Sequence, residues 1–223
     1  PAAAAFALAG GSGALFAETS IPPGKGFGFS GSARVAGLAA ASLQQSGSIH
    51  FPDLLKLSGK LEGHYDNVAA SIYGSVTATT GNSVVRLKCP SQLEVLVWIP
   101  DSKTSTNASR RHLPSSVSLE VATRALARSS VLVAAIASSD LAAIRECCRD
   151  DLHQPTRLAT QPDSGLAIES ALESGACGAW LSGSGPAVAA FVEQDHVDSV
   201  REAFPSSGHS KLLKVAQHGI SVS

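Results

Sequence analysis

The segment best suited to hold a phosphate group is the glycine-rich stretch at residues 22–32. Three glycines stand at alternate positions within it: Gly24, Gly26 and Gly28. Because glycine has no Cβ, such a turn lets backbone N–H groups point at an anion. Residues 33–45 predict a helix directly after the turn, and a helix N-terminus attracts the same phosphate. Ser30 and Ser32 add hydroxyls for a phosphate or an oxygen-seeking metal. On glycine content alone, a flexible loop or a hairpin turn fits equally well.

Two further segments place polar or glycine residues beside predicted elements. Residues 62–67, Glu-Gly-His-Tyr-Asp-Asn, form a dense polar patch ahead of an apolar helical stretch. Asp66 in this patch could serve only as the N-cap of that helix. Residues 182–186, Ser-Gly-Ser-Gly-Pro, lie between two predicted strands, where a tight turn is the simpler interpretation. Neither glycine cluster has the G-x-S-x-G pattern, so a serine hydrolase is disfavoured.

Two other polar segments, residues 104–111 and 153–157, end in arginine. The planar guanidinium can bind a carboxylate with two hydrogen bonds, so both segments are candidates for holding an acidic ligand. Each arginine taken singly could equally be a solvated surface charge or part of a structural ion pair. The histidines show no spacing typical of a metal site.

The composition predicts an ordinary globular protein with a sizeable core. The 223 residues are 44% apolar and 16% charged, with a net charge of −1. The lack of a basic block argues against a nucleic-acid partner, and the lack of an apolar run of about 18 residues argues against a membrane partner. The four cysteines contain no C-x-x-C pair, and we expect them to be reduced, as in the cytoplasm. Because the chain starts at Pro1 and has no methionine, we expect a preceding segment to be missing.

Hydrophobic periodicity predicts the elements that must position these segments. Helices are expected at residues 33–45, 52–61, 67–73, 118–137, 141–149, 164–173 and 197–204. Strands are expected at residues 13–20, 75–80, 84–88, 93–99, 176–181, 187–192 and 211–216. From residue 93 onward the order is strand, helices, strand, strand, helix and strand, which is a ferredoxin-like pattern. The predicted fold class is α+β, with two halves that divide near residue 90.

Taken in order, these segments resemble the GHMP kinases, and the homoserine kinases among them. Residues 22–32 resemble the family's P-x-G-x-G-L-G-S-S-A-A phosphate loop, and residues 62–69 resemble its E-G-H-P-D-N-V-A segment. Residues 106–114 are similar to T-x-x-A-R-x-x-L-P, residues 153–157 to H-Q-P-x-R, and residues 182–186 to S-G-[AS]-G-P. The resemblance covers nearly the whole chain, and the combination is far more specific than any single segment.

The resemblance implies a two-domain fold and a reaction. Residues 1–90 would form a nucleotide-binding half, similar to ribosomal protein S5 and incomplete at its N-terminus. Residues 91–223 would form a ferredoxin-like half that carries substrate-binding segments. The implied reaction is phosphorylation of the side-chain hydroxyl of L-homoserine by ATP, with Mg²⁺, in the threonine biosynthesis of the cytoplasm. A homodimer is left open.

The resemblance also implies site residues. The nucleotide would be held by Pro23, Gly24, Lys25, Gly26, Phe27, Gly28, Phe29, Ser30, Gly31 and Ser32. The catalytic residues beside the reacting hydroxyl would be His64, Asp66 and Asn67. The amino-acid substrate would be bound by Thr106, Arg110, Arg157, Gly183 and Gly185. The two arginines would engage its carboxylate, and Ser30 would be a metal ligand.

Two positions depart from the family pattern. Phe29 replaces the first of two successive serines in the phosphate loop. Lys56 stands eight residues before His64, where the family is expected to place a metal-binding glutamate. Because a lysine cannot ligate Mg²⁺, a non-catalytic pseudokinase that still binds an amino acid or a nucleotide stays open beside the active kinase. A kinase of mevalonate or of a sugar is a third alternative, which the arginine segments disfavour.

Overall fold

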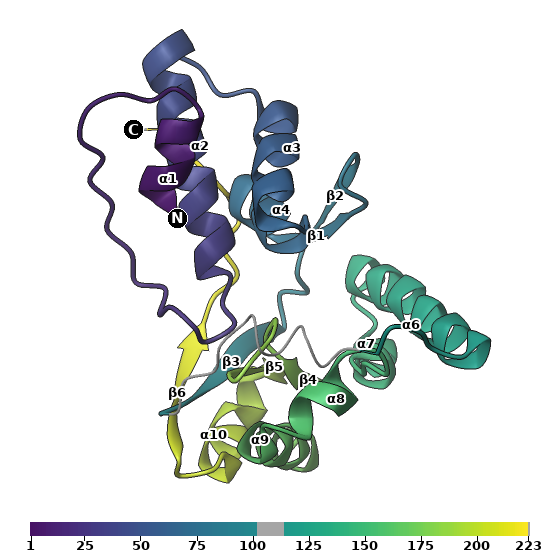
Figure 1. Cartoon of the computed structure of the whole chain (residues 1–223). Coiled ribbons are helices and arrows are strands. Elements are labelled where there is room, and N and C mark those ends of the chain that lie inside the picture. The colour runs from purple at the N-terminus through teal and green to yellow at the C-terminus, as the bar shows by residue number, and fades with distance from the viewer. Residues whose placement is uncertain (102–113, 223) are drawn as a thin grey trace. The chain divides into compact units, whose positions relative to one another are not determined.

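The computed structural model of the chain describes residues 1–101 and 114–222, which form two compact units (Figure 1). The first unit comprises Pro1–Pro23, Gly28–Lys88 and Ala216–Ser223. The second comprises Gly24–Phe27 and Cys89–Val215. The assignment of residues 1–90 to nucleotide binding and of residues 91–223 to substrate binding stays a prediction.

The first unit is mainly helical and has its own apolar core. Its elements are the helices α1 (Ala2–Leu8), α2 (Phe29–Ser46), α3 (Phe51–Glu62) and α4 (Asp66–Tyr73) and the strands β1 (Val76–Thr79) and β2 (Val84–Leu87). β1 and β2 pair in antiparallel fashion, as the expected hairpin requires. The core is built from buried residues of the helices, namely Ala5, Val35, Leu38, Ala39, Leu54, Leu55, Val68, Ala69 and Ile72.

Glycine and proline set the ends of the helices that carry the polar patch. α2 begins after Gly28 and ends at Gly47, and both glycines have left-handed backbone angles. α3 begins with Pro52 in its first turn, where its missing N–H costs nothing, and ends at Gly63. These stops place Glu62 at the last position of α3, directly ahead of the turn that leads into α4.

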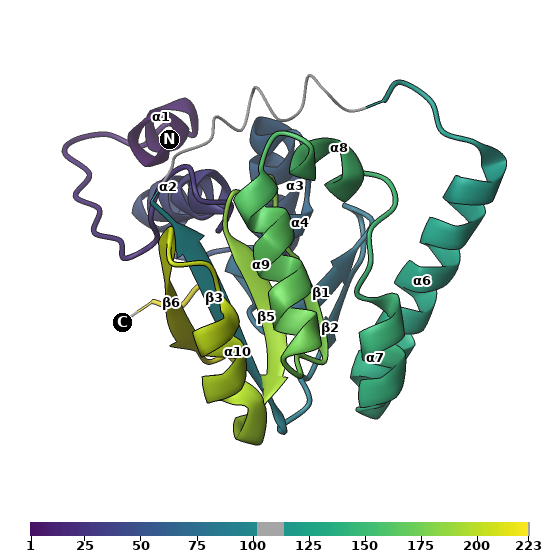
Figure 2. The same cartoon turned by 90° about the horizontal axis from the view of Figure 1, so that it is seen from below.

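The second unit is built on a four-stranded antiparallel sheet (Figure 2). Its elements are β3 (Leu93–Pro100), α6 (Leu119–Ser138), α7 (Leu141–Cys147), α8 (Gln154–Leu158), α9 (Pro162–Glu173), β4 (Gly178–Leu181), β5 (Val188–Glu193), the 3₁₀ turn η1 (Gln194–His196), α10 (Val197–Ala203) and β6 (Gly208–Leu213). The strand order is β4-β5-β3-β6, and each neighbouring pair is antiparallel. The predicted ferredoxin-like arrangement of this half is confirmed.

The two faces of this sheet bury different residues. α9 and α10 lie across one face (Figure 2) and pack on a core that includes Leu96, Trp98 and Val188. On the other face a smaller cluster contains Val97 and Ile99 of β3. Phe27 packs against this smaller cluster, which agrees with the assignment of Gly24–Phe27, the middle of the glycine-rich stretch, to the second unit.

Two sequence predictions about strands are wrong. Residues 13–20 form no strand, because no partner strand accepts their backbone, and Phe16 is 93% exposed. The last strand is shifted toward the N-terminus, since β6 pairs with β3 from Gly208 opposite Pro100 to Leu213 opposite Val95. The carbonyl of Ala216, which we expected in this strand, instead accepts a hydrogen bond from the N–H of Ser75 over 2.7 Å.

Helix α6 begins at the predicted N-cap, because the Ser118 side chain accepts a hydrogen bond from the N–H of Val121. By length and composition alone, α6 is the one helix in residues 1–101 and 114–222 that could cross a membrane. Arg124 and Arg128 of this helix both donate to the carboxylate of Asp151, at 2.7 and 2.5 Å. The α6 helix is therefore tied to the segment that precedes α8 by a shared aspartate.

Candidate functional site

The N-terminus of α2 carries the end of the glycine-rich stretch in the first unit. Gly28 caps the helix with a φ of 73°, and a Cβ there would come within 3.1 Å of the Asn67 side-chain oxygen. The first N–H groups of a helix have no partner inside the helix, and no acidic residue lies in the first turn of α2. This helix end therefore favours an anion such as phosphate.

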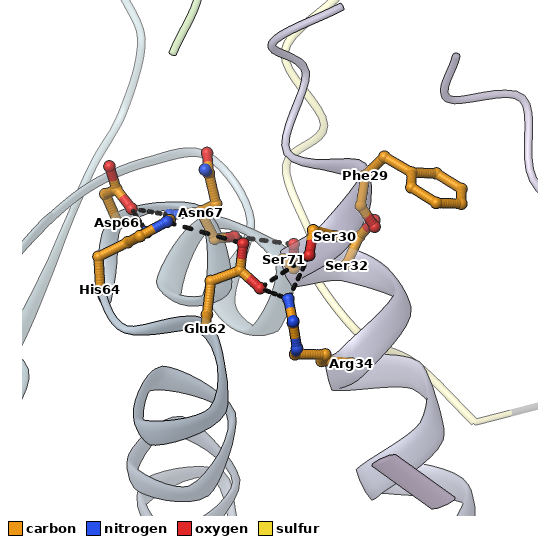
Figure 3. A network of polar contacts seen from close by, with 9 residues as sticks. All are labelled: Phe29, Ser30, Ser32, Arg34, Glu62, His64, Asp66, Asn67 and Ser71. Atoms are coloured by element: carbon orange, nitrogen blue, oxygen red, sulfur yellow. Dashed lines mark hydrogen bonds and ion pairs between the residues drawn. The ribbon is translucent and has the colours of Figure 1, made fainter. Parts of the chain in front are cut away.

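The Ser30 side chain faces Glu62 at the end of α3 (Figure 3). Its hydroxyl donates a hydrogen bond to Glu62 Oε2 over 3.1 Å. Arg34, one turn further along α2, contacts both residues through Nη1. The Glu62 side chain is only 8% exposed, and a buried carboxylate is costly unless it is paired and hydrogen-bonded. Ser30, Arg34 and Glu62 together supply that pairing, and we call them the Ser30–Glu62–Arg34 cluster.

His64 lies between two carboxylates beside this cluster. Its Nδ1 is 2.5 Å from Asp66 Oδ1, and its Nε2 is 3.6 Å from Glu62 Oε1. The Asp66 side chain is 76% exposed, so its second oxygen is open to a ligand. The Asn67 backbone N–H donates to the same Asp66 oxygen over 2.8 Å. The structure brings His64, Asp66 and Asn67 together, and their catalytic role stays a prediction.

The carboxylate nearest to the Ser30 hydroxyl is not at the position that the family spacing suggested. Lys56 lies on an exposed part of α3, whereas the carboxylate at the Ser30 hydroxyl belongs to Glu62. The end of α3, not its middle, meets the start of α2, because Gly63 stops the helix directly after Glu62. Lys56 therefore does not lie beside the Ser30 hydroxyl in the way that Glu62 does, and a metal-binding role at either position stays a prediction.

The structure also places Phe29, Ser32 and Asp66, three further residues that the sequence analysis singled out. The ring of Phe29 points away from the polar network (Figure 3), so it does not cover the Ser30 hydroxyl. The Ser32 hydroxyl donates to the Phe29 carbonyl over 3.1 Å, inside the first turn of α2. The N-cap of α4 is Tyr65, so the interpretation of Asp66 as that N-cap is wrong.

In the second unit, residues Gly24–Phe27 are fastened to the sheet and to the turn after β4. Lys25 is only 8% exposed, and its Nζ donates to the carbonyl of Pro100 at the end of β3. A Cβ at Gly26, whose φ is 89°, would overlap the carbonyl oxygen of Ser182. The Ser182 hydroxyl donates to the Gly26 carbonyl over 3.3 Å. Glycine is therefore required at residue 26 by backbone angle and by space.

Helix α8 is pinned to the turn after β4 by its polar side chains. Gln154 Oε1 accepts the N–H of Leu181 over 2.5 Å, and Arg157 Nη1 donates to the Gly183 carbonyl over 2.9 Å. Asp150 accepts three backbone N–H groups at the start of the helix, from Leu152, His153 and Gln154. The sequence-predicted Arg157 and Gly183 are thus in direct contact.

Residues 182–186 form the tight turn that the simpler interpretation predicted. The Gly185 N–H donates to the Ser182 carbonyl over 2.8 Å, and Gly185 has a φ of 76°. The buried Ser164 hydroxyl of α9 donates to the Pro186 carbonyl over 2.7 Å. Gln161, which is 7% exposed, donates to the Ser184 carbonyl over 3.4 Å. Substrate binding by Gly183 and Gly185 stays a prediction.

Two predicted substrate residues, Thr106 and Arg110, lie outside the described residues. Within residues 1–101 and 114–222, no group of three or more His, Cys, Asp or Glu side chains could hold a metal. Mg²⁺ does not require such a group, because it is usually held by one or two protein oxygens together with phosphates and waters.

Several residues of these sites were not predicted from the sequence: Arg34, Glu62, Asp150, Gln154 and Gln161. Arg34 follows Ser30 by four residues, but the predicted helix began only at residue 33, so the sequence did not place the two side chains on one helical face. Glu62 is the glutamate of the E-G-H segment itself. It was not considered as a ligand because the metal-binding glutamate was expected eight residues before His64. Asp150 could have been recognised as a capping residue ahead of a helix with proline in its first turn.

The four cysteines are free thiols, and three of them are buried. Burial, together with Cys147 and Cys177, raises the pKa of Cys148 to about 12. Burial also raises the pKa of Cys89 and Cys177. At neutral pH these groups are protonated and poor nucleophiles.

Two family models match the sequence. The model of the GHMP kinases N terminal domain matches residues 2–75, and the model described as GHMP kinases C terminal matches residues 132–210. The first match contains the Ser30–Glu62–Arg34 cluster with His64, and the second contains α8 and the turn at residues 182–186.

Relatives of known name cover most of the chain. The homoserine kinase of Desulfitobacterium hafniense is 36% identical over 207 residues, covering 91% of this chain and 67% of the relative. That of Thermus thermophilus is 40% identical over 173 residues, covering 77% of this chain and 59% of the relative. The crystal structure of homoserine kinase from Cytophaga hutchinsonii has a TM-score of 0.80 at 25% identity, covering 90% of this chain and 69% of that one. This chain therefore spans between 59% and 69% of the length of these three proteins.

Proposed function

We propose that this chain, which belongs to the homoserine kinase family within the GHMP kinases, takes part in the ATP-dependent phosphorylation of L-homoserine. The hydroxyl oxygen of homoserine would bond to the γ-phosphorus while the bond to the bridging oxygen of ADP breaks, and the hydroxyl would lose its proton. The observation that carries the proposal is the Ser30–Glu62 hydrogen bond at the N-terminus of α2, inside a chain with two GHMP kinase regions. The product would be O-phospho-L-homoserine, an intermediate of threonine biosynthesis in the cytoplasm.

We assign the nucleotide phosphates to the glycine-rich stretch from Pro23 to Ser32. The backbone N–H groups at the start of α2 are free of helical partners and attract negative charge. Phosphoryl transfer needs little covalent help from a protein, so catalysis would come from positioning and charge. Lys25 supports the stretch through its bond to Pro100, and the positive φ angles of Gly26 and Gly28 give the stretch its tight backbone path.

The donor set of the first unit fits Mg²⁺. The Ser30 hydroxyl and the Glu62 carboxylate are hard oxygen ligands within 3.1 Å of each other, and Arg34 already brings a positive charge to the same oxygens. When bound, Mg²⁺ would neutralise charge on the β- and γ-phosphates. Ser30 and Glu62 would hold it, and His64 and Asp66 would orient the substrate hydroxyl and accept its proton.

We propose that arginine side chains bind the carboxylate of the amino-acid substrate. Arg157 projects from α8, and the resemblance adds Thr106 and Arg110 to the same task. A guanidinium binds a carboxylate with fixed geometry, whereas a neutral sugar or a mevalonate hydroxyl has no need of two such groups. No finding favours the pseudokinase alternative, because Phe29 points away from the network and Glu62 supplies the oxygen ligand.

The proposal is tested by measuring ADP release from the purified protein with ATP and Mg²⁺. We expect the highest kcat/KM for L-homoserine, and no turnover above background for mevalonate or a neutral sugar. Calorimetry with L-homoserine in the absence of ATP serves as the binding control. Homoserine binding without any homoserine-dependent ADP release would contradict the proposed reaction, and so would faster turnover of either alternative substrate.

A further inference from the structure

Arg34 contacts both oxygen donors of the proposed metal site. Its Nη1 atom touches the Ser30 hydroxyl and Glu62 Oε2 (Figure 3), and the Ser30 hydroxyl is itself bonded to Glu62 Oε2. The position follows from the helix, because residues four apart on α2 lie on one face. A single guanidinium nitrogen thus stands beside the same carboxylate oxygen that a metal would use.

Burial makes this contact more than a surface ion pair. The Glu62 side chain is 8% exposed and that of Arg34 is 28% exposed. A carboxylate removed from water to this extent requires a counter-cation, and removing the only cation from such a pair is strongly destabilising. His64 lies on the other oxygen of Glu62, with Nε2 3.6 Å from Oε1, so Oε2 is the oxygen that Arg34 shares with Ser30.

We propose that Arg34 is the resident counter-cation of the Ser30–Glu62 pair, and that a divalent metal must displace it in order to bind. The inference rests on the metal site of the proposed function. Mg²⁺ and a guanidinium nitrogen cannot occupy the same place at Glu62 Oε2, so metal entry breaks the Arg34–Glu62 ion pair. The free protein would therefore bind a divalent metal weakly, and Arg34 would set that affinity.

A purely structural ion pair leads to different behaviour. If Arg34 only stabilised the fold, its removal would lower stability and would leave metal affinity unchanged or weaker. If Arg34 competes with the metal, its removal exposes a buried carboxylate without a cation, which raises metal affinity. The affinity for metal, measured without nucleotide, separates the two cases.

The experiment is a titration of the purified protein with Mn²⁺, followed by the electron paramagnetic resonance of the free ion, without nucleotide or substrate. Arg34→Gln should bind Mn²⁺ about tenfold more tightly than the parent, since a charged hydrogen bond no longer competes. Arg86→Gln, which removes an exposed arginine of the same unit, should match the parent. Arg34→Gln combined with Glu62→Gln should lose the gain. Equal or weaker binding by Arg34→Gln would overturn the inference.

A second measurement covers the case in which Arg34→Gln does not fold. The side-chain nitrogen resonances of arginine are followed in the parent protein during Mg²⁺ addition, with Arg34 assigned through Arg34→Lys. The Arg34 signal should shift and sharpen as its ion pair breaks, while that of Arg86 stays in place. An Arg34 signal unchanged at saturating Mg²⁺ would refute the displacement.

The outcomes for the inference and for the proposed function are separable. Tighter Mn²⁺ binding by Arg34→Gln in a protein that does not phosphorylate homoserine would keep the displacement and reject the reaction. If the protein phosphorylates homoserine but Arg34→Gln does not change its Mn²⁺ affinity, the proposed reaction stands and the displacement of Arg34 is rejected.

Discussion

At the scale of single residues, Glu62 connects the polar groups of the first unit. Its two oxygens meet Ser30, Arg34 and His64, and its side chain is almost completely buried. In the proposed function, Glu62 would therefore supply the hard oxygen ligand, although Lys56 stands where the family pattern suggested a glutamate. The amide of a glutamine would keep the shape of Glu62 without its charge.

We predict that Glu62→Gln lowers kcat for homoserine phosphorylation by at least about 100-fold, because loss of a metal ligand removes several kcal/mol of charge stabilisation. The Mg²⁺ concentration needed for half-maximal rate should rise as well. Lys56→Gln is the matched control on the same helix and should leave both quantities unchanged. A Glu62→Gln enzyme with parental kcat and Mg²⁺ dependence would show that Glu62 is not the metal position.

Lys25 is a buried charged residue whose side chain should contribute to the stability of the second unit. Its Nζ donates to the Pro100 carbonyl, so Lys25→Met should lower the free energy of unfolding by about 1.5–3 kcal/mol, as expected for a hydrogen bond to a charged group. Urea denaturation measures the change. Lys211→Met, at an exposed position of β6, should stay within about 0.5 kcal/mol of the parent. If both substitutions change the free energy of unfolding equally, the hydrogen bond between Lys25 and Pro100 does not contribute to stability.

The sequence predicted which residues could form the site, but not which of their side chains contact one another. Ser30, His64, Asp66 and Arg157 were all identified from motif resemblance. The partner of Ser30 was misplaced because spacing along a chain does not say where a helix stops, and Gly63 stops α3 at Glu62. Arg34 was overlooked because a single arginine on a predicted helix has no pattern of its own.

At the scale of elements, Asp150 organises the short helix α8. Three backbone N–H groups converge on its carboxylate, which holds Gln154 and Arg157 against the turn that follows β4. A helix of five residues has little stability of its own, so its position depends on this cap.

We predict that Asp150→Ala costs about 1–2 kcal/mol of stability through loss of the cap. It should also raise KM for L-homoserine, because Arg157 loses its fixed position. Asp140→Ala removes the comparable cap of α7, where Asp140 accepts the N–H of Ala143, and should lower stability with KM unchanged. If both variants raise KM equally, the increase is caused by general destabilisation and not by a displaced α8.

The attachment of α6 should be sensitive to acid. Arg124 and Arg128 hold the pKa of Asp151 below its ordinary value of 3.8. A lowered pKa means that the ion pairs stabilise the fold fully above that value and lose their effect as the pH falls through the folded-state pKa. The difference in unfolding free energy between the parent and Asp151→Asn should be constant from neutral pH to about pH 5 and shrink below about pH 4.

The matched control for this pH dependence is Asp198→Asn. Asp198 pairs with Arg201 in an exposed position of α10, where an ion pair contributes little. Its difference from the parent should be small at every pH. A difference for Asp151→Asn that grows on acidification would contradict the assigned direction of the shift.

Most elements could be predicted because their patterns are strong. The N-cap of α6, the hairpin β1–β2 and the strand β3 lie where periodicity and capping residues indicated. Residues 13–20 were misassigned because a short apolar run has the composition of a strand whether or not a neighbour pairs with it. The register of β6 could not be predicted from local sequence either, because it is fixed by pairing with β3, which is far away in the sequence.

At the scale of the whole molecule, the fold class was predictable from element order and from the resemblance. The α+β assignment and the GHMP kinase fold are confirmed by the two family regions and by the homoserine kinase of Cytophaga hutchinsonii. The substrate could not be read from composition or charge, because a net charge of −1 and an ordinary apolar fraction fit many small-molecule enzymes.

The central claim is that the hydroxyl of L-homoserine receives the γ-phosphate of ATP. Phosphorus NMR of the purified protein with ATP, Mg²⁺ and L-homoserine tests it most directly. The account predicts a new phosphomonoester signal that coincides with authentic O-phospho-L-homoserine and grows in step with ADP. Formation of ADP with inorganic phosphate alone, or unchanged ATP in the presence of bound homoserine, would contradict it.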